Sequence, residues 1–432
     1  MSAVIPSSSA PSGARWVQLV LGLIAMMAIS SPQYVWTLFV KPFQTTTGAT
    51  LPAIQVTFSL LIVLQTWFSP AQGWLIDRFG PKLLVAIGGL LSGAGWVLSA
   101  HVTTLPALYA TYGLFCGIGT GIVYVGIVGL MVRWFPDWRG FATGIVAAGY
   151  GFGAILTTIP IDSMIRSSGH QATLTTFGII LGLVGMAAAL GLRIPRRDET
   201  AAAMAHVQVA SSTRDTAPKE MLKTPVFWLM FAMMTMMSTG GLMVISQFAN
   251  FARDFGVANI VIWGTAALPL ALTVDRITNG LTRPFFGWIS DRIGRENTMG
   301  LAFLLEAAAV TVMLLMRDNA MAFVVLSAVV FFGWGEIFSL FPSTLTDTFG
   351  TKHATTNYGF LYMAQGVGSV LGGPVAAMIY GAAGSWMPVF SLIIAMDVLT
   401  ALLALAVLKP WRAALLDYGS APLVVSPKTA NA

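Results

Sequence analysis

The sequence predicts an all-α membrane protein with twelve transmembrane helices, arranged as two halves of six helices each. Three observations support this prediction: charge is scarce, twelve long stretches are apolar, and one motif occurs twice. Of the 432 residues, 56% are hydrophobic and only 9% are charged, against roughly 25% in a soluble domain. So few charges do not cover a water-soluble protein of this size, and the composition also excludes a disordered chain.

A helix that crosses the bilayer needs about 20 mostly apolar residues. Such stretches run, to within a few residues, over 15–40, 51–76, 83–101, 105–132, 139–165, 171–193, 225–252, 258–288, 298–316, 319–345, 354–380 and 386–408. A polar stretch from Arg193 to Thr224 separates the sixth from the seventh, with the composition of a linker that has no buried face. We therefore expect five parts: a disordered cytoplasmic tail (1–14), an N-terminal half (15–193), a cytoplasmic linker (194–224), a C-terminal half (225–408) and a cytoplasmic tail (409–432).

The distribution of lysine and arginine predicts that both termini face the cytoplasm. With that orientation, only four of the 23 cations fall in outer loops: Lys41, Arg166, Arg253 and Arg317. Arg276 and Arg283 lie within a span, and all the others lie on cytoplasmic segments. The net charge of +6 is therefore a topology signal, and we expect a lipid bilayer rather than a nucleic acid as the partner.

The sequence predicts neither an enzyme nor a cofactor or metal site. The single cysteine, Cys116, lies in an apolar stretch, and the four histidines are scattered. A nucleophile with a base and a phosphate-binding loop are both missing from the sequence. The first residues lack the charged region and the cleavage site of a signal peptide.

One motif occurs in both halves: GWLIDRFG begins at Gly73, and GWISDRIG begins at Gly287, 214 positions later. The halves are thus related by duplication, which is a known basis for alternating access around a mid-membrane site. We expect Asp77 and Asp291 to cap helix N-termini and to accept hydrogen bonds from arginines nearby. A plain stop-transfer turn would not explain the recurrence, so we predict a cytoplasmic gate of both aspartates with Arg78, Arg133, Arg139 and Arg292.

This motif, in a chain of six spans, a cytoplasmic loop and six spans, resembles the major facilitator superfamily. Other stretches resemble its oxalate/formate antiporter family of bacterial anion transporters: SPQYVWTLFVKPF from Ser31, RWFPDWRGFATG from Arg133, NGLTRPFFGWISDRIGR from Asn279 and NYGFLYMAQG from Asn357. The resemblance implies a secondary transporter of small organic anions, which works as a monomer by alternating access in a bacterial inner membrane.

The eighth span carries an unusual set of polar residues. An ionisable group within a span raises the free energy of membrane insertion by roughly 2.5–3.5 kcal/mol, so its presence indicates a structural or functional role. Arg276, Asn279 and Arg283 share one side of this span, which must face the protein interior. The resemblance implies that Arg283 binds the substrate carboxylate, which the planar guanidinium fork suits. The alternative is an ion pair of this arginine with an acid: Asp275, Glu306 or Glu336.

The resemblance also implies a cavity lined by aromatic and amide side chains. Hydroxyl and amide groups bind a carboxylate without adding charge, and aromatic rings enclose its apolar part. The residues at matching positions are Gln33, Tyr34, Tyr124, Tyr150, Trp334 and Tyr362. Each alone is more often a packing or interfacial residue, so the prediction depends on their joint placement.

Gln365 departs from the family pattern, because the oxalate-transporting member has a lysine at this position of span 11. In a low-dielectric cavity a dianion needs two cations to balance its charge, whereas a monoanion needs one. We therefore predict a monocarboxylate such as formate, lactate or pyruvate, exchanged or co-transported with a proton. The alternatives are oxalate:formate exchange with Arg276 as the second cation, and a non-transporting membrane sensor of the same fold.

Further acids in the spans raise the question of proton coupling. Glu336 lies beside the expected cavity and either carries a proton with the substrate or pairs with an arginine. Asp275 and Arg276 are the other candidates for proton or charge coupling, although pairing with an acid is the stronger expectation for Arg276. For Glu306 and Asp397 we expect structural pairing or snorkelling to the outer leaflet. Asp162, near a span end, is expected to be exposed.

Overall fold

The computed structural model describes residues 13–212 and 214–420, and it confirms the all-α membrane fold. Among these residues, nine helices are long and apolar enough to cross a membrane, and a bent pair of helices makes a tenth span. The 52-residue helix α9 (Arg139–Leu190) breaks at Gly169, whose φ of 81° lies in the left-handed region, so it contributes two spans. Helix α13 (Ala267–Ile293), which carries the polar stripe of the eighth predicted span, completes the expected twelve.

The N-terminal half consists of α1 (Ala14–Ala28), α2 (Ser31–Tyr34), α3 (Trp36–Thr47), the bent pair α4 (Leu51–Trp67) and α5 (Ser69–Phe79), α6 (Pro81–Ser99), α7 (Leu105–Leu108), the π-helix η1 (Tyr109–Cys116), α8 (Gly117–Trp134) and α9. The C-terminal half consists of α12 (Pro225–Asp254), the strands β1 (Val261–Ile262) and β2 (Thr265–Ala266), α13, α14 (Arg295–Leu315), α15 (Ala320–Trp334), α16 (Ile337–Phe349), α17 (Ala354–Ala383), α18 (Met387–Leu403) and the π-helix η2 (Ala404–Leu408). The linker contains α10 (Arg197–Met204) and α11 (Pro218–Met221), and α19 (Lys409–Ser420) follows η2.

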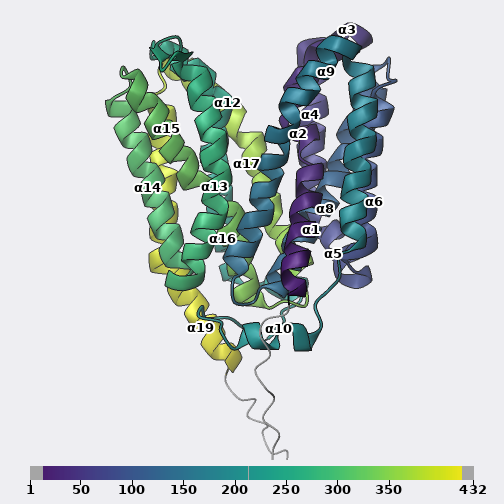
Figure 1. The fold of residues 1–432 in the computed structure, drawn as a ribbon. Coiled ribbons are helices and arrows are strands. Elements are labelled where there is room, and N and C mark those ends of the chain that lie inside the picture. The colour runs from purple at the N-terminus through teal and green to yellow at the C-terminus, as the bar shows by residue number, and fades with distance from the viewer. Residues whose placement is uncertain (1–12, 213, 421–432) are drawn as a thin grey trace, which may run out of the picture.

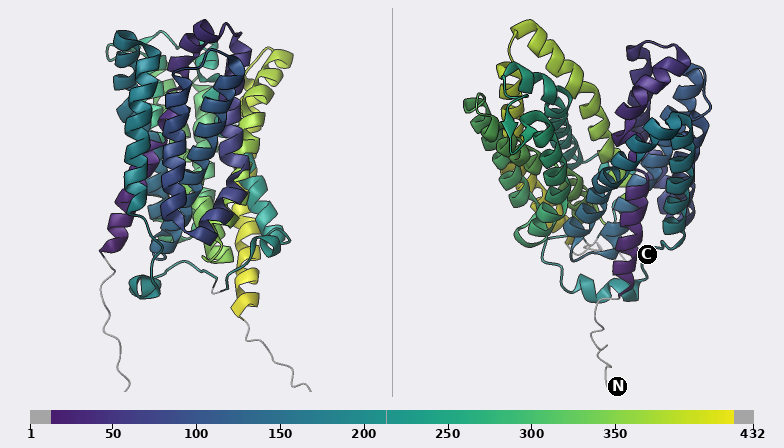
Figure 2. Two further views of the ribbon diagram at one scale, coloured as in Figure 1. Left: turned by 90° about the vertical axis from the view of Figure 1, so that its right-hand side faces the viewer. Right: turned by 45° about the horizontal axis from the view of Figure 1, so that its top comes forward.

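The two halves splay apart at one end of the molecule and meet at the other (Figure 1). Helix α10 lies at the end where they meet, and so do the start of α1 and the helix α19 (Figure 2). We call this the linker end and the opposite one the splayed end.

Glycines of the doubled motif bring the halves into close contact at the linker end. A Cβ atom on Gly73 of α5 would collide with the backbone of Thr355 at the start of α17. In the same way, a Cβ atom on Gly287 of α13 would collide with the backbone of Gly140 at the start of α9. Small residues allow helix backbones to approach closely, so each motif packs its first glycine against the opposite half.

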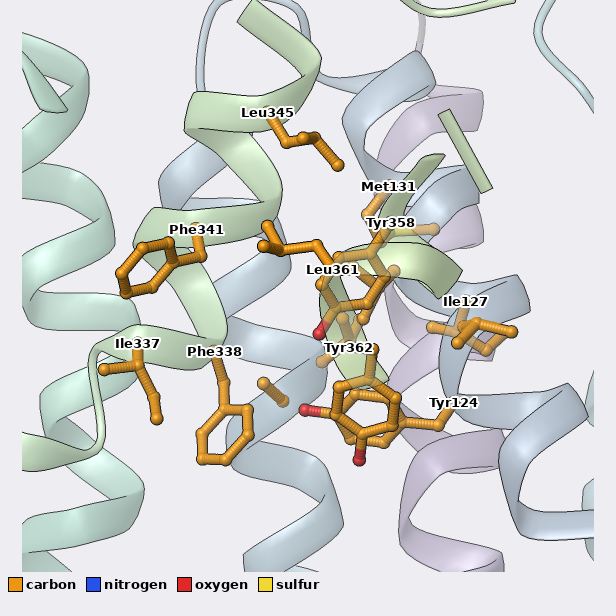
Figure 3. Packing of buried hydrophobic residues seen from close by; sticks show 14 of the residues in the cluster. Tyr124, Ile127, Met131, Ile337, Phe338, Phe341, Leu345, Tyr358, Leu361 and Tyr362 are labelled. Atoms are coloured by element: carbon orange, nitrogen blue, oxygen red, sulfur yellow. The ribbon is translucent and has the colours of Figure 1, made fainter. Parts of the chain in front are cut away.

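An apolar core fills the space between the halves near the middle of the molecule. Figure 3 shows side chains from three helices that meet there. Helix α8 contributes Tyr124, Ile127 and Met131 and α16 contributes Ile337, Phe338, Phe341 and Leu345, while α17 contributes Tyr358, Leu361 and Tyr362. This core places aromatic rings of both halves against one another.

The start of the eighth span differs from the prediction. The span expected from residue 258 starts only at Ala267, because β1 and β2 form a short antiparallel hairpin before it. Its two turn residues, Trp263 and Gly264, both have positive φ, of 49° and 80°. A two-residue turn of that kind matches the twist of paired strands, which is why the chain leaves the helix here.

The prediction of a linker without a buried face is wrong. Helix α10 forms in its Ala-rich run with a capping box at Glu199, and Ala203 and Met221 are buried. The segment expected as a tail from residue 409 is also partly ordered, since buried Arg412 of α19 pairs with Glu296 of the C-terminal half. Most of the predicted terminal tails, residues 1–12 and 421–432, lies outside the described residues.

Candidate functional site

Arg283 lies on α13 in the middle of the contact between the halves, with 3% of its surface exposed. Helix α9 crosses α13 closely here, since a Cβ atom on Gly144 would collide with the Arg283 backbone. The guanidinium donates from Nη1 to the carbonyl oxygen of Ala147 and from Nη2 to Oδ1 of Asn279 (3.0 Å). The N-terminal half and the side chain one turn away thus hold the arginine in place.

The guanidinium of Arg283 forms no direct ion pair with an acid among the described residues, and its Nε has no hydrogen-bond partner there. The ion pair considered from the sequence, with Asp275, Glu306 or Glu336, is therefore not formed in this structure. The guanidinium carbon instead lies 4.7 Å from the centroid of the Phe338 ring, a cation–π contact. A buried cation without a counter-charge is costly, so the position favours binding of an anion.

Four tyrosines predicted to line a cavity form one cluster beside this arginine. The rings of Tyr124 and Tyr362 stack with centroids 4.8 Å apart (Figure 3). The Tyr150 ring lies edge-on to Tyr124 and also to Tyr34, at 5.4 Å in both pairs. Tyr34 is 39% exposed, whereas the other three are buried, so the cluster runs from the surface to the interior.

Amide side chains fix the hydroxyl groups of this cluster. Tyr150 donates to Oε1 of Gln33 (2.6 Å), and Nε2 of Gln65 donates to the Tyr362 hydroxyl (3.0 Å). The amide oxygen of Gln65, Oε1, is buried and has no hydrogen-bond partner among the described residues. The same holds for Oε1 of Gln365. Such unsatisfied buried atoms are costly in a folded protein and mark the place where a polar ligand would bind.

Phe338 and Gln65 are contacts that the sequence reasoning missed. Phe338 lies one turn after Trp334, which was predicted to line the cavity, so this spacing was an available signal. Trp334 itself donates its indole N–H to the carbonyl oxygen of Met237 (2.8 Å) and packs edge-on against Phe338. Its polar group is thus engaged with backbone, and the ring supports the aromatic wall.

The three candidates for proton or charge coupling lie in different surroundings. Asp275 is buried and accepts a hydrogen bond from Ser327 (3.1 Å). Arg276 is exposed and, in the described part of the chain, forms no ion pair. Glu336 lies between α15 and α16, fully buried, with neither carboxyl oxygen hydrogen-bonded.

For Glu306 and Asp397 the expectation of pairing or snorkelling is wrong. Both side chains are fully buried, and all four carboxyl oxygens lack a hydrogen-bond partner. These acids lie inside the C-terminal half because α14 and α18 pack on one another and turn them inward. Asp162, in contrast, is half exposed and pairs with Arg166 one turn on (2.8 Å), as expected for a span end.

Each motif aspartate caps a helix of the opposite half at the linker end. Asp77 accepts from the backbone N–H (2.8 Å) and the hydroxyl (2.6 Å) of Thr356, at the start of α17. Asp291 accepts from the backbone N–H groups of Gly140 (3.0 Å) and Phe141 (2.9 Å), at the start of α9. Carboxylates at helix N-termini are favourable because they meet free N–H donors and the positive end of the helix dipole.

Arginines complete this network. Arg133 pairs with Asp77, and Arg139 of the N-terminal half pairs with Asp347 of the C-terminal half. Arg295 binds both Asp291 (2.6 Å) and Asp347 (2.7 Å). Arg295 and Asp347 were not predicted; Arg295 directly follows the second motif.

Arg78 and Arg292, predicted as gate residues, lie outside the network. Their guanidinium carbons lie 5.2 Å from the Trp74 ring and 3.7 Å from the Trp288 ring. Successive residues of a helix point about 100° apart, so the residue after each inward aspartate points away from the contact. This part of the gate prediction is therefore wrong.

Within the described chain, no three His, Cys, Asp or Glu side chains converge as a metal site would require. The site is therefore built from one guanidinium, several amides and phenols, and aromatic walls. Such a set has the charge and the hydrogen-bonding groups to bind the carboxylate of a small organic anion.

Comparison with known proteins agrees with this chemistry. Residues 19–274 and 251–428 match the family model of the Major Facilitator Superfamily. The sequence is 36% identical to the oxalate:formate antiporter of Oxalobacter formigenes over 368 residues, which cover 85% of each chain. It is 23% identical to monocarboxylate transporter 13 of Rattus norvegicus, with 77% of this chain and 74% of that protein covered.

A similar fold occurs in the solved structure of a proton:xylose symporter of the major facilitator superfamily, bound to 6-bromo-6-deoxy-D-glucose. The TM-score is 0.69, and the match covers 91% of this chain and 96% of that chain. The sequences are only 14% identical, so this likeness concerns the fold alone.

Proposed function

The chain belongs to the oxalate/formate antiporter family of the major facilitator superfamily, and we propose that it carries a small monocarboxylate by alternating access. As a member of this family it is a multi-pass membrane transporter and not an enzyme.

The observation that carries the proposal is the buried, unpaired guanidinium of Arg283. Its Nε is free of hydrogen bonds within the described residues, and it lies beside a cluster of tyrosines. In our proposal a substrate carboxylate binds this group, with Asn279 and the tyrosine hydroxyls as further partners. The rings of Phe338, Tyr124 and Tyr362 would enclose the apolar part of the acid.

The charges at the site support a monoanion rather than a dianion. One buried cation lies at the tyrosine cluster, and Gln365 supplies an amide instead of a second charge. Arg276, seven residues before Arg283 on α13, is exposed, so it is not a second buried cation at the tyrosine cluster. Oxalate:formate exchange is the alternative, because the relative that bears this name is 36% identical.

In our proposal both termini and the linker end face the cytoplasm of a bacterial inner membrane, so the structure represents an outward-facing state. The network of Asp77, Arg133, Asp291 and Arg139 then acts as the cytoplasmic gate, joined by Arg295 and Asp347. Binding of a carboxylate neutralises Arg283, and the splayed ends close around it. The gate opens when the halves rock, and the substrate leaves to the cytoplasm.

The test is a counterflow assay with the purified protein in liposomes, which are loaded with unlabelled acid and supplied with labelled formate, lactate or oxalate. We expect uptake of a labelled monocarboxylate, competed by other monocarboxylates, and loss of this uptake in Arg283→Gln. Uptake of oxalate in preference to monocarboxylates would favour the alternative. Saturable binding of the acid without counterflow would instead identify a sensor.

A further inference from the structure

We propose that Glu306, Glu336 and Asp397 form a proton-binding site inside the C-terminal half, which binds and releases a proton as the carboxylate comes and goes. The inference rests on the proposed function, because it concerns what moves together with the substrate. It adds Glu306 of α14 and Asp397 of α18 to Glu336, the acid that borders the carboxylate site.

All three side chains are fully buried, and within residues 13–212 and 214–420 none of their six carboxyl oxygens has a hydrogen-bond partner. An ionised carboxylate under these conditions has lost its hydration shell and gained nothing in return. A protonated carboxyl group avoids that penalty, because it carries no net charge and presents both a donor and an acceptor. Protons are therefore the ligands that satisfy this cluster.

The packing of the helices brings the three acids together. A Cβ atom on Gly333 of α15 would lie 2.7 Å from the Cβ atom of Glu306, so α14 packs directly on this turn of the chain. Glu336 follows three residues after Gly333, on the next turn. Electrostatic interaction joins Glu306 to both Glu336 and Asp397.

One cation lies close enough to interact with the cluster. On α13, Arg283 interacts electrostatically with Glu336, and this helix also carries Asp275, Arg276, Asp291 and Arg292. The charged residues of α12 are confined to its splayed end, and those of α14 other than Glu306 to its linker-end start. Helix α15 and the segment η2 carry no charged residue, α16 carries Asp347 at the linker end, and α18 carries only Asp397.

This arrangement links proton binding to the occupancy of Arg283. With the substrate site empty, the guanidinium favours an ionised Glu336, since it supplies the nearby positive charge. When a substrate carboxylate pairs with Arg283, that support is withdrawn. Glu336 then takes one proton from water on the open side, with a new O–H bond formed. The proton is returned to water on the other side when the substrate leaves.

Glu306 and Asp397 give the cluster a reserve of acceptors for that proton. Because Glu306 interacts electrostatically with both Glu336 and Asp397, the proton that enters at Glu336 is shared among the three carboxyl groups, and loss of any one of them weakens proton binding. In the described residues the three carboxyl groups do not converge as metal ligands do, so we infer a proton rather than a metal cation as the ligand.

The experiment measures protons and carboxylate in the same liposomes, with a pH-sensitive dye enclosed and labelled carboxylate outside. We expect the wild-type protein to acidify the lumen during uptake, and the ratio of protons to carboxylate to fall at least two-fold in Glu306→Gln and Asp397→Asn. The matched control is Asp318→Asn, whose side chain is 89% exposed and should leave the ratio unchanged.

Infrared difference spectra of the wild-type protein provide a readout that does not depend on folded variants. Added carboxylate should increase the absorption of protonated carboxyl groups. If the protein shows counterflow but its net uptake of carboxylate leaves the lumen pH unchanged, or if added carboxylate gives no infrared change, the inference is overturned while the proposed function stands. Uptake driven by a sodium gradient in place of a pH gradient would also overturn it. Absence of counterflow altogether would refute the proposed function first.

Discussion

Tyr124 and Tyr362 stack almost parallel to each other across the two halves of the protein, with centroids 4.8 Å apart and an interplanar angle of 8°. Because α8 and α17 belong to different halves, this contact must break or slide whenever the halves rock. The two rings border the proposed substrate site. Their stacking also opposes the movement of the halves that opens this site.

Tyr362→Phe keeps the stacked ring and removes the hydroxyl to which Gln65 donates. A neutral hydrogen bond contributes about 1 kcal/mol, so we expect KM for the carboxylate to rise roughly three- to ten-fold. Tyr362→Ala should also change the turnover number, since the stack is lost. Tyr109→Phe is the control, because this hydroxyl binds the Ala53 carbonyl away from the site. An unchanged KM in Tyr362→Phe would exclude the hydroxyl as a substrate contact.

Arg283→Lys retains the positive charge and loses the planar fork that binds Ala147, Asn279 and Phe338. Charge-assisted hydrogen bonds contribute about 1.5–3 kcal/mol, so we expect kcat/KM to fall roughly ten- to 100-fold. Initial rates of counterflow measure this, with Arg317→Lys at an exposed position as the control. Wild-type rates in Arg283→Lys would show that only charge matters at this position.

Gln365→Lys adds a second cation to the substrate site. Because two positive charges balance a dianion, we expect competition by oxalate to strengthen at least ten-fold relative to competition by formate. The measurement is inhibition of labelled formate counterflow, and Gln365→Met serves as an uncharged control of similar length. If oxalate inhibits formate counterflow equally in both variants, the Gln365 side chain does not face the substrate.

Asp77→Asn and Asp291→Asn each remove a charge that caps a helix of the opposite half. Loss of about 1.5–3 kcal/mol should shift the equilibrium toward an open linker end by roughly ten- to 100-fold. Spin labels at Leu83→Cys and Ile293→Cys, with the buried Cys116 replaced by serine, report this as longer distances. Asp162→Asn at the splayed end is the control and should leave the distances unchanged. Unchanged distances in Asp77→Asn and Asp291→Asn as well would show that the gate does not depend on these aspartates.

The linker offers a test of pH dependence. The guanidinium of Arg193 and the backbone N–H of Arg196 lower the pKa of Glu199 from 4.5 to about 2. A lowered pKa means that this contact stabilises the folded linker fully above pH 4.5 and loses its contribution as the pH falls toward 2. The carboxyl carbon resonance of Glu199 should titrate near pH 2 and move upward in Arg193→Gln. Titration near 4.5 in the wild-type protein would contradict the contact.

The sequence predicted the spans well, because a lipid environment demands long apolar helices whatever their neighbours. It also predicted the capping by Asp77 and Asp291, since a repeated motif constrains both halves alike. It missed Phe338, Gln65, Arg295 and Asp347, whose roles arise from tertiary packing between helices far apart in the chain. The direction of a side chain around its helix misled the prediction for Arg78 and Arg292, and the burial of Glu306 and Asp397 depended on which helices pack behind them.

The reciprocal capping at the linker end has the geometry of an isologous interface, in which the same patch of each partner meets its counterpart. Here both partners lie in one polypeptide, so the chain keeps the two-fold symmetry of a dimer after the sequences of its halves have diverged. Each latch is a copy of the other, and a lesion in one leaves the second in place. Complete loss of closure would then require damage to both latches, whereas damage to one alone shifts the equilibrium toward the open linker end without abolishing closure.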